Sequence, residues 1–195
     1  MKYLPIFLDL NGKRCIVIGD GYGAEEKVRL LAEAGAEVFH SHEYKSGALA
    51  GYYLAIAATG DAALNDEIRL EADQHNVLFN AVDYPARCQF IFPAIHRQGD
   101  LVVAVSSSGK SPALASRVRD LVAERVGPEY STLLEMLAEL RPEVATMHPR
   151  FEVRRRVWNE LLDSEALEFI RAANPERARA LLKSIVERSA DDRRE

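Results

Sequence analysis

The feature that most constrains the fold of this chain is a buried strand that runs directly into a glycine turn. The run from Arg14 to Ile18 is almost wholly apolar, as in strands that are covered on both faces. Gly19-Asp20-Gly21-Tyr22-Gly23-Ala24 follows at once, and the next residues repeat apolar side chains at helical spacing up to Gly35. A strand, a glycine turn and a helix in this order predict a Rossmann-type α/β fold.

The same turn predicts a site for the pyrophosphate of a dinucleotide. Gly19 permits the tight turn, Gly21 lets the backbone approach the pyrophosphate, and the small Ala24 lets helix and strand pack closely. The helix N-terminus adds unpaired N–H groups and the positive end of its dipole. An incidental glycine-rich turn is the alternative, and the flanking strand and helix favour the dinucleotide. An acidic residue is expected about twenty positions on. Only Glu43 lies near that distance, so the sequence does not separate NAD from NADP.

Strands and helices alternate through the first half of the chain. Further strands are expected at residues 37–39, 53–58 and 77–80, with a helix over 64–75, which predicts a parallel, doubly wound sheet. Apolar runs between 90 and 105 flank a turn at 97–100 and predict a hairpin. From Pro112 onward the pattern is helical, with helices expected over 112–126, 129–140, 150–162, 164–172 and 175–189.

One connection is too short for this fold. Parallel neighbouring strands need a connection of roughly a dozen residues or more, usually a helix. The segment between Phe39 and Tyr53 contains Ser46, Gly47 and Gly51, which break a helix rather than make one. Either an irregular segment replaces the crossover, or residues are missing here.

Composition excludes several classes of function. The formal net charge of −5 disfavours nucleic acid as the main partner. Arg150 and Arg154–Arg156 are interpreted as a solvated helix face. The chain has no apolar stretch of the ~20 residues that a membrane span needs. Its N-terminal segment is too short and interrupted for a signal peptide, so a cytoplasmic protein is expected.

Cysteine and histidine give no sign of a metal site. The two cysteines, Cys15 and Cys88, form neither a disulfide framework nor a zinc spacing, and Cys15 is expected to be a small buried hydrophobe. The five histidines show no ligand spacing, and most are expected at the surface.

A carboxylate follows the last predicted strand of the sheet. Asn80-Ala81-Val82-Asp83 ends that strand, and ligands of open parallel sheets bind beyond the carboxyl ends of strands. Asp83 is therefore a candidate functional residue, although Asp83-Tyr84-Pro85 is equally a plain turn sequence.

A serine-rich loop precedes the first of the later helices. Gly109-Lys110-Ser111 imitates a phosphate-binding P-loop, but Ala104 stands where that motif needs its first glycine. The structural interpretation is a helix capped by Ser111 with Pro112 in its first turn. The functional one is an anion site made of hydroxyls, backbone N–H groups and Lys110, and both can hold together.

Taken together, these segments resemble the precorrin-2 dehydrogenase family, which forms the N-terminal module of siroheme synthases. The resemblance runs in order from the N-terminus to about residue 125. It is carried by Leu4–Leu8, Cys15–Gly21, Lys27–Leu31, Leu54–Thr59, Asn80–Asp83, Phe90–Ala94 and Val105–Ala115.

The resemblance implies an enzyme that oxidises precorrin-2 to sirohydrochlorin with NAD, and in some members also inserts Fe²⁺ to make sirohaem. It casts Asp83 as the catalytic residue. It implies cofactor contacts at Gly19, Gly21, Tyr22, Gly23, Ala24 and Thr59. Substrate contacts are implied at Asn80, Ser106, Ser107 and Lys110. Ser107 matches a serine that is phosphorylated in some relatives.

The resemblance also completes the expected domain organisation. Residues 1–111 are expected to form the NAD-binding Rossmann-like domain, residues 112–145 a dimerisation segment, and residues 146–195 a helical C-terminal domain. A homodimer that binds a tetrapyrrole, with neither nucleic acid nor membrane as partner, is the expected assembly.

Three departures from the family pattern stand out. Asp20 interrupts the usual triple glycine, Gly23 replaces the usual valine, and the family has additional residues where the connection after Phe39 is short. These departures leave open a second hypothesis, a non-catalytic protein that binds NAD or a tetrapyrrole as a sensor or carrier.

Overall fold

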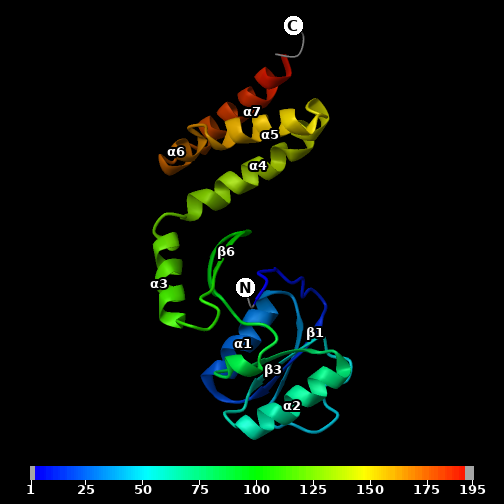
Figure 1. Ribbon diagram of the computed structural model, residues 1–195. Coiled ribbons are helices and arrows are strands. Elements are labelled where there is room, and N and C mark those ends of the chain that lie inside the picture. The colour runs from blue at the N-terminus through cyan, green and yellow to red at the C-terminus, as the bar shows by residue number, and fades with distance from the viewer. Residues whose placement is uncertain (1–2, 192–195) are drawn as a thin grey trace. The chain divides into compact units, whose positions relative to one another are not determined.

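The computed structural model describes residues 3–191, with side chains described through residue 188. The chain divides into two compact units, which Figure 1 shows with the helices and some of the strands labelled. The first unit comprises the chain up to Phe92 together with Ser106–Ser111. The second comprises Pro93–Val105 and the chain from Pro112 onward.

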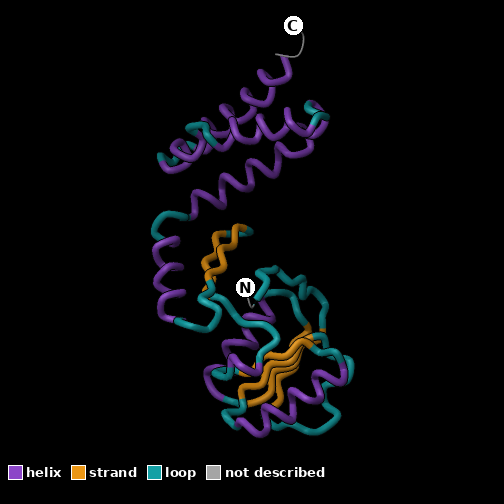
Figure 2. The backbone as a smooth tube through the Cα atoms, viewed as in Figure 1, coloured by secondary structure: helices purple, strands orange, loops and turns teal. Residues whose placement is uncertain are grey.

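A four-stranded parallel sheet forms the centre of the first unit (Figure 2). Its strands lie in the order β2-β1-β3-β4. Their bounds are Arg14–Gly19 for β1, Glu37–Ser41 for β2, Leu54–Ala58 for β3 and Leu78–Ala81 for β4. Two helices join them, α1 over Gly21–Glu33 and α2 over Ala62–His75. The predicted Rossmann-like α/β fold is confirmed.

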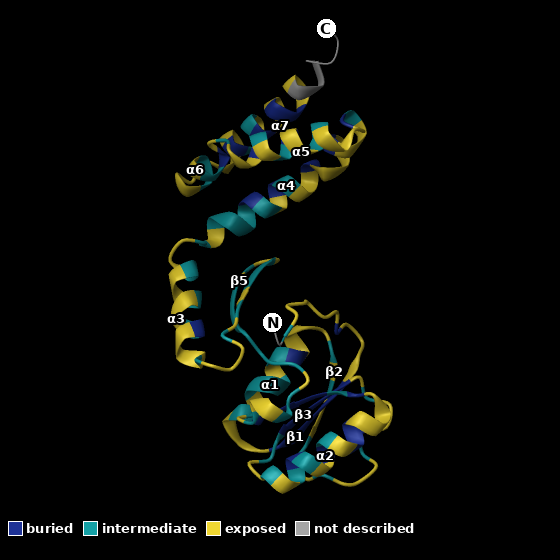
Figure 3. Cartoon of the chain, in the orientation of Figure 1, coloured by how far each residue is buried: buried dark blue, intermediate teal, exposed yellow. Residues whose placement is uncertain are grey.

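The apolar runs form the sheet because alternate residues pack on opposite faces. Cys15 and Val17 pack with Ala24 and Leu31 of α1. Their neighbours in β1, Ile16 and Ile18, belong instead to the cluster that includes Ile68 and Ala72 of α2. Figure 3 shows the resulting buried strands β1 and β3. Cys15 is fully buried as predicted, and this burial raises the pKa of its thiol.

The short connection between β2 and β3 contains turns and no helix. It leaves the edge strand β2 and passes to β3, on the far side of β1. In this chain an irregular segment of turns takes the place of a crossover helix. Leu49 anchors that segment because its side chain is fully buried among the residues that pack under α2.

The second unit begins with an antiparallel hairpin of β5, Ala94–Gln98, and β6, Leu101–Val105. Its turn is confirmed, but Phe90–Pro93, expected in the first strand, precede it. The hairpin packs against α3, Pro112–Ala123, and against α4, Pro128–Met147. For that reason it belongs to the second unit, whereas the sequence had assigned the whole of 1–111 to one domain.

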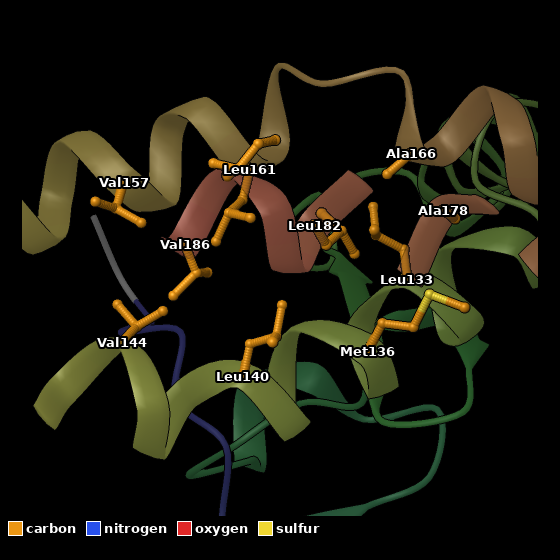
Figure 4. Packing of buried hydrophobic residues seen from close by; sticks show 11 residues of the cluster. Leu133, Met136, Leu140, Val144, Val157, Leu161, Ala166, Ala178, Leu182 and Val186 are labelled. Carbon is orange, nitrogen blue, oxygen red and sulfur yellow. The ribbon is translucent and has the colours of Figure 1, made fainter. Parts of the chain in front are cut away.

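Helix α4 packs with α5, α6 and α7 around one apolar core. Their bounds are Phe151–Leu162 for α5, Ala166–Arg171 for α6 and Pro175–Asp191 for α7. The core side chains shown in Figure 4 include Leu140 and Val144 of α4, Val157 and Leu161 of α5, and Leu182 of α7. Within residues 3–191, no helix is long and apolar enough to cross a membrane.

One expectation for this unit was wrong. The helix expected to end at residue 140 continues through Pro142 to Met147, because Leu140 and Val144 on either side of the proline are buried in the core. That packing offsets the hydrogen bond that a proline removes from a helix interior. His148 is fully buried, whereas His40, His42 and His75 are exposed, as expected for most of the histidines.

Candidate functional site

A crevice opens where the strand order of the sheet reverses. Helix α1 carries the chain from β1 to β2 on one side, while β3 lies on the other side of β1. Open parallel sheets bind ligands at such a point, beyond the carboxyl ends of the strands. A cavity of about 540 Å³ lies here, lined by Gly19, Asp20, His42, Glu43, Tyr44, Ala58, Thr59, Gly60 and Leu64.

Gly19 forms the floor between β1 and β3. Its φ of +118° is a conformation that side-chain-bearing residues rarely adopt. A Cβ atom at this position would overlap the carbonyl oxygen of Ala58 and lie 2.9 Å from the amide nitrogen of Thr59. The positive φ is the role predicted for Gly19 in the tight turn, and the close approach of two strand ends is a second reason why glycine is required here.

Gly21 and Gly23 differ from Gly19 in what surrounds them. Gly21 has a φ of +79°, and a Cβ there would meet no atom within 4 Å. A Cβ on Gly23 would lie 3.5 Å from Val82, an ordinary contact. Ala24 is fully buried, which fits the predicted need for a small residue where helix and strand pack. Tyr22 is exposed.

The N-terminus of α1 is open to an anion. Asp20 occupies its N-cap position, yet no side-chain capping bond to the first turn is present in the described chain. The Asp20 carboxylate is hydrogen-bonded instead to Nδ1 of His42. His40 Nε2 donates to the carbonyl oxygen of Gly19 at 2.8 Å. The carboxylate that departs from the family pattern is thereby held by the segment after β2.

Glu71 of α2 fixes the irregular connection that walls the crevice. Its nearly buried carboxylate accepts hydrogen bonds from the amide of Leu49 at 2.6 Å, from the amide of Gly47 at 3.0 Å and from the hydroxyl of Tyr44. Burial acts to raise the pKa of Glu71, but these hydrogen bonds outweigh it and hold the pKa below its ordinary value. Burial and the bond to Glu71 raise the pKa of Tyr44 to about 12, so its hydroxyl remains a donor.

Thr59 follows β3 and lines the crevice. Its hydroxyl donates to Oδ1 of the buried Asn65 at 2.8 Å and accepts the backbone N–H of Asp61 at 3.1 Å. Asp61 in turn caps α2 by accepting the N–H groups of Ala63 and Leu64. Thr59 is therefore fixed to the beginning of α2.

Asp83 stands in a tight turn just after β4. Its φ of +65° lies in the left-handed region, which aspartate tolerates better than most residues. Among the described residues, no hydrogen bond or ion pair engages its exposed carboxylate. The turn is closed by the N–H of Tyr84, which donates to the carbonyl of Ala81 at 3.2 Å. A strained residue with a free carboxylate at a strand end is a candidate for chemistry.

Arg87 ties the far end of this turn to α2. It ends the short 3₁₀ helix η1, Pro85–Arg87, and its guanidinium donates to both carboxylate oxygens of Asp66. The hydrogen bond from Arg87 lowers the pKa of Asp66, so the pair stays ionic. Asp83 consequently sits on a turn anchored at both of its ends.

The serine loop lies against the Asp83 turn. A Cβ on Gly109 would lie 3.6 Å from the Pro85 ring, and the loop shares the first unit with the sheet. The hydroxyl of Ser107 accepts the N–H of Ser111 at 2.9 Å, and that of Ser106 accepts the N–H of Ser108 at 3.0 Å. Lys110 is exposed.

Asn80 is placed differently from the other substrate candidates. It is buried, and its Nδ2 donates to the carbonyl of Phe90 at 2.9 Å. This bond joins β4 to the segment that follows the Asp83 turn. The side-chain amide of Asn80 therefore stabilises the end of β4.

Sequence reasoning missed part of the crevice wall. His42 and Tyr44 line the cavity, together with Glu43, which the spacing had singled out. Gly60 and Leu64 line it beside Thr59. The position of His42 just after a strand could have indicated that it lines the crevice. It was missed because no structure was expected for the connection that contains it. Within the described residues, no group of three or more His, Cys, Asp or Glu side chains is arranged to hold a metal.

Three family models match the chain in order. A putative NAD(P)-binding family matches residues 6–41 and 39–94. The central region of sirohaem biosynthesis proteins matches residues 98–125, and the dimerisation region of sirohaem synthase matches 129–185. The dimerisation match thus lies further along the chain than the segment 112–145 expected from the sequence.

The curated relatives are siroheme synthases. The chain is 35% identical over 204 residues to the siroheme synthase of Pseudomonas aeruginosa strain PAO1. This alignment covers 94% of this chain and 44% of the relative. The chain is 32% identical over 215 residues to the siroheme synthase of Methylococcus capsulatus, covering 100% of this chain and 45% of the relative. The chain thus spans less than half the length of these proteins.

These alignments also bear on the short connection. The 215 aligned positions exceed the 195 residues of this chain, so the relative has residues in the aligned region that this chain lacks. The NAD(P)-binding match divides at residues 39–41, where β2 ends and the short connection begins.

The fold has a counterpart among solved structures. A protein described as SirC, precorrin-2 dehydrogenase, superposes with a TM-score of 0.74 over 93% of this chain and 100% of its own, at 18% identity. That likeness supports the fold, while the three family models and the curated relatives identify the lineage. The chain belongs to the siroheme synthase family and corresponds to its NAD(P)-binding, central and dimerisation regions.

Proposed function

We propose that this protein oxidises precorrin-2 to sirohydrochlorin with NAD. The observation that carries the proposal is the relation between Asp83 and the crevice. Asp83 presents an unpartnered carboxylate after β4, and β4 lies next to β3, whose end lines the crevice. A dinucleotide site and a free carboxylate thus share one edge of the sheet.

The residues of the crevice fit a dinucleotide. Gly21 leaves room for a pyrophosphate to approach the backbone, and the uncapped N-terminus of α1 offers N–H groups to it. Thr59 offers a hydroxyl on the other side of the crevice. Tyr22, Gly23 and Ala24 complete the turn without lining the cavity. When bound, NAD supplies a hydride acceptor.

Asp83 is assigned the role of accepting the proton that the substrate loses. Loss of two hydrogens from the substrate releases a hydride and a proton, and a carboxylate at hydrogen-bonding distance accepts the proton. No bond from another described residue competes for the Asp83 carboxylate. The neighbouring turn bonds hold its backbone in place, so only the side chain has to be ordered at each turnover.

The serine loop is assigned the role of binding the carboxylates of the substrate. Precorrin-2 is a polycarboxylate, and Lys110, Ser106 and Ser107 lie on a loop that contacts the Asp83 turn through Gly109 and Pro85. A lysine ammonium and backbone N–H groups are suitable partners for carboxylates. Asn80 contributes by holding β4 rather than by direct contact.

The test is an anaerobic incubation of the purified chain with precorrin-2 and NAD. Equal amounts of NADH and sirohydrochlorin, followed by their absorbance, are the expected products. The proposal fails if the folded protein gives neither at saturating NAD. Insertion of Fe²⁺ is a separate prediction, measured with sirohydrochlorin and Fe²⁺ in the absence of NAD.

A homodimer is part of the proposal. The match to a dimerisation region over residues 129–185 supports it. Exposed apolar side chains on α3 at Leu114, Val118 and Leu121 provide a second surface for a partner copy. Sedimentation equilibrium of the purified chain measures the assembly.

A further inference from the structure

Asn65 is a fully buried polar residue beneath the crevice. It lies in the first turn of α2, immediately after Leu64, which lines the cavity. Its Oδ1 accepts the hydroxyl proton of Thr59 at 2.8 Å, and Thr59 also lines the cavity. Asn65 is therefore linked to the crevice through one hydrogen bond.

That bond determines what Thr59 can offer to a ligand. A threonine hydroxyl has one proton and two lone pairs. The proton is directed to Asn65, with the carbonyl of Asp61 as a longer alternative at 3.2 Å. The N–H of Asp61 uses one lone pair. One lone pair remains, so Thr59 can accept a hydrogen bond from a ligand but cannot donate one.

The other half of the Asn65 amide points to a functional reason for this residue. Its Nδ2 is buried and has no partner in the described chain. A buried donor without a partner is unfavourable, and an apolar residue of similar shape would avoid it. Folding alone therefore does not account for an asparagine here, whereas orienting Thr59 does.

We propose that Asn65 is a positioning residue of the dinucleotide site, which fixes Thr59 as a hydrogen-bond acceptor. The ligand group received at Thr59 is then a donor, either a ribose hydroxyl or the carboxamide N–H of the nicotinamide. A pyrophosphate offers only acceptors and is directed to the glycine turn across the crevice. This inference rests on the proposed binding of NAD.

Titration calorimetry of NAD with the intact chain tests it, on wild type, Thr59→Val, Asn65→Leu and the double variant. Each single variant is expected to lower the affinity for NAD about five- to tenfold, which corresponds to the loss of one hydrogen bond. The double variant is expected to bind no more weakly than either single one, because both act through the same bond. Thr59→Ser, which keeps the hydroxyl, is expected to bind like wild type.

Two further ligands separate the possible donors. ADP-ribose lacks the carboxamide. If Thr59→Val weakens ADP-ribose binding as much as NAD binding, the donor to Thr59 is a ribose hydroxyl. If Thr59→Val leaves ADP-ribose binding unchanged, the donor is the carboxamide. Inorganic pyrophosphate is expected to bind wild type and Thr59→Val equally. This comparison does not depend on the folding of any Asn65 variant.

Several outcomes overturn the inference. These are wild-type affinity for NAD in folded Asn65→Leu, losses that multiply in the double variant, or a loss of inorganic pyrophosphate binding in Thr59→Val. Thermal unfolding checks that each variant is folded. Failure of wild type to bind NAD at all overturns the proposed function itself, and this inference with it.

Discussion

The thiol of Cys88 spans the turn that presents Asp83. Its Sγ lies 3.3 Å from the amide nitrogen of Ala81, before Asp83, and 3.3 Å from the carbonyl oxygen of Tyr84, after it. It also lies 3.3 Å from the carbonyl of Ala81. One side chain thus holds both ends of a turn whose central aspartate has a left-handed backbone.

Replacing Cys88 with alanine is expected to loosen this turn. We expect a loss of about 1 kcal/mol in the free energy of unfolding, from lost hydrogen bonds and a small void. The turnover number is expected to fall while the affinity for NAD is retained, because Asp83 moves and the crevice does not. Urea unfolding and steady-state kinetics measure the two effects. Cys88→Ser, which keeps a donor and acceptor, is the matched control, and an unchanged turnover number in Cys88→Ala would refute the role.

The Glu71 carboxylate is expected to stabilise the fold in a pH-dependent way. Its pKa is lower in the folded protein than in the unfolded chain, so its contribution is fully present above the ordinary glutamate pKa of about 4.3 and is lost as the pH falls through the folded value. Glu71→Gln is expected to lose about 2–3 kcal/mol at neutral pH, because buried N–H donors lose a charged acceptor. The difference from wild type should shrink below pH ~4. Urea unfolding across pH 3–7 measures it, and a constant difference would contradict the assignment.

Three glycine variants separate folding from cofactor binding. Gly19→Ala is expected to destabilise the sheet by about 3 kcal/mol or more, since its methyl group would overlap the backbone of β3. Gly21→Ala meets no atom within 4 Å, so only its positive φ destabilises it, by about 1–2 kcal/mol. Its methyl group is nevertheless expected to lower the affinity for NAD at least tenfold, because it blocks the approach of the pyrophosphate to the backbone.

Gly23→Ala is the control in this series. A Cβ there makes only an ordinary contact with Val82, and the helical backbone favours alanine over glycine by up to about 1 kcal/mol. We expect equal or greater stability and unchanged affinity for NAD. Thermal unfolding and calorimetry provide both numbers. Weakened NAD binding by Gly23→Ala without such an effect in Gly21→Ala would show that the turn is used differently.

Much of the first unit could be predicted because its signals are local. The apolar runs of β1 and β3 and the positive-φ glycine after β1 follow from neighbouring residues. The strand end at Asp83 could be placed at the sheet edge because parallel strands finish on one side. Whether Asp83, Lys110 and the serines contact substrate remains a prediction.

The remainder depended on residues far apart in sequence. The wall formed by the segment after β2 is held by Glu71, 22 residues beyond Leu49, and no local pattern indicates that carboxylate. The continuation of α4 through Pro142 depends on packing against α5 and α7. Similarly, the hairpin joins the second unit because of contacts with α3 and α4.

The most direct test of the account compares wild type with Asp83→Asn. Asparagine tolerates the left-handed backbone at this position, so the variant is expected to fold and to bind NAD like wild type. It cannot accept the proton, and the rate of NADH formation with precorrin-2 is expected to fall by a factor of about 10²–10⁴. Equal rates in the two proteins would remove Asp83 from the reaction. Tight NAD binding without turnover in wild type would instead identify a binding protein and contradict the central claim.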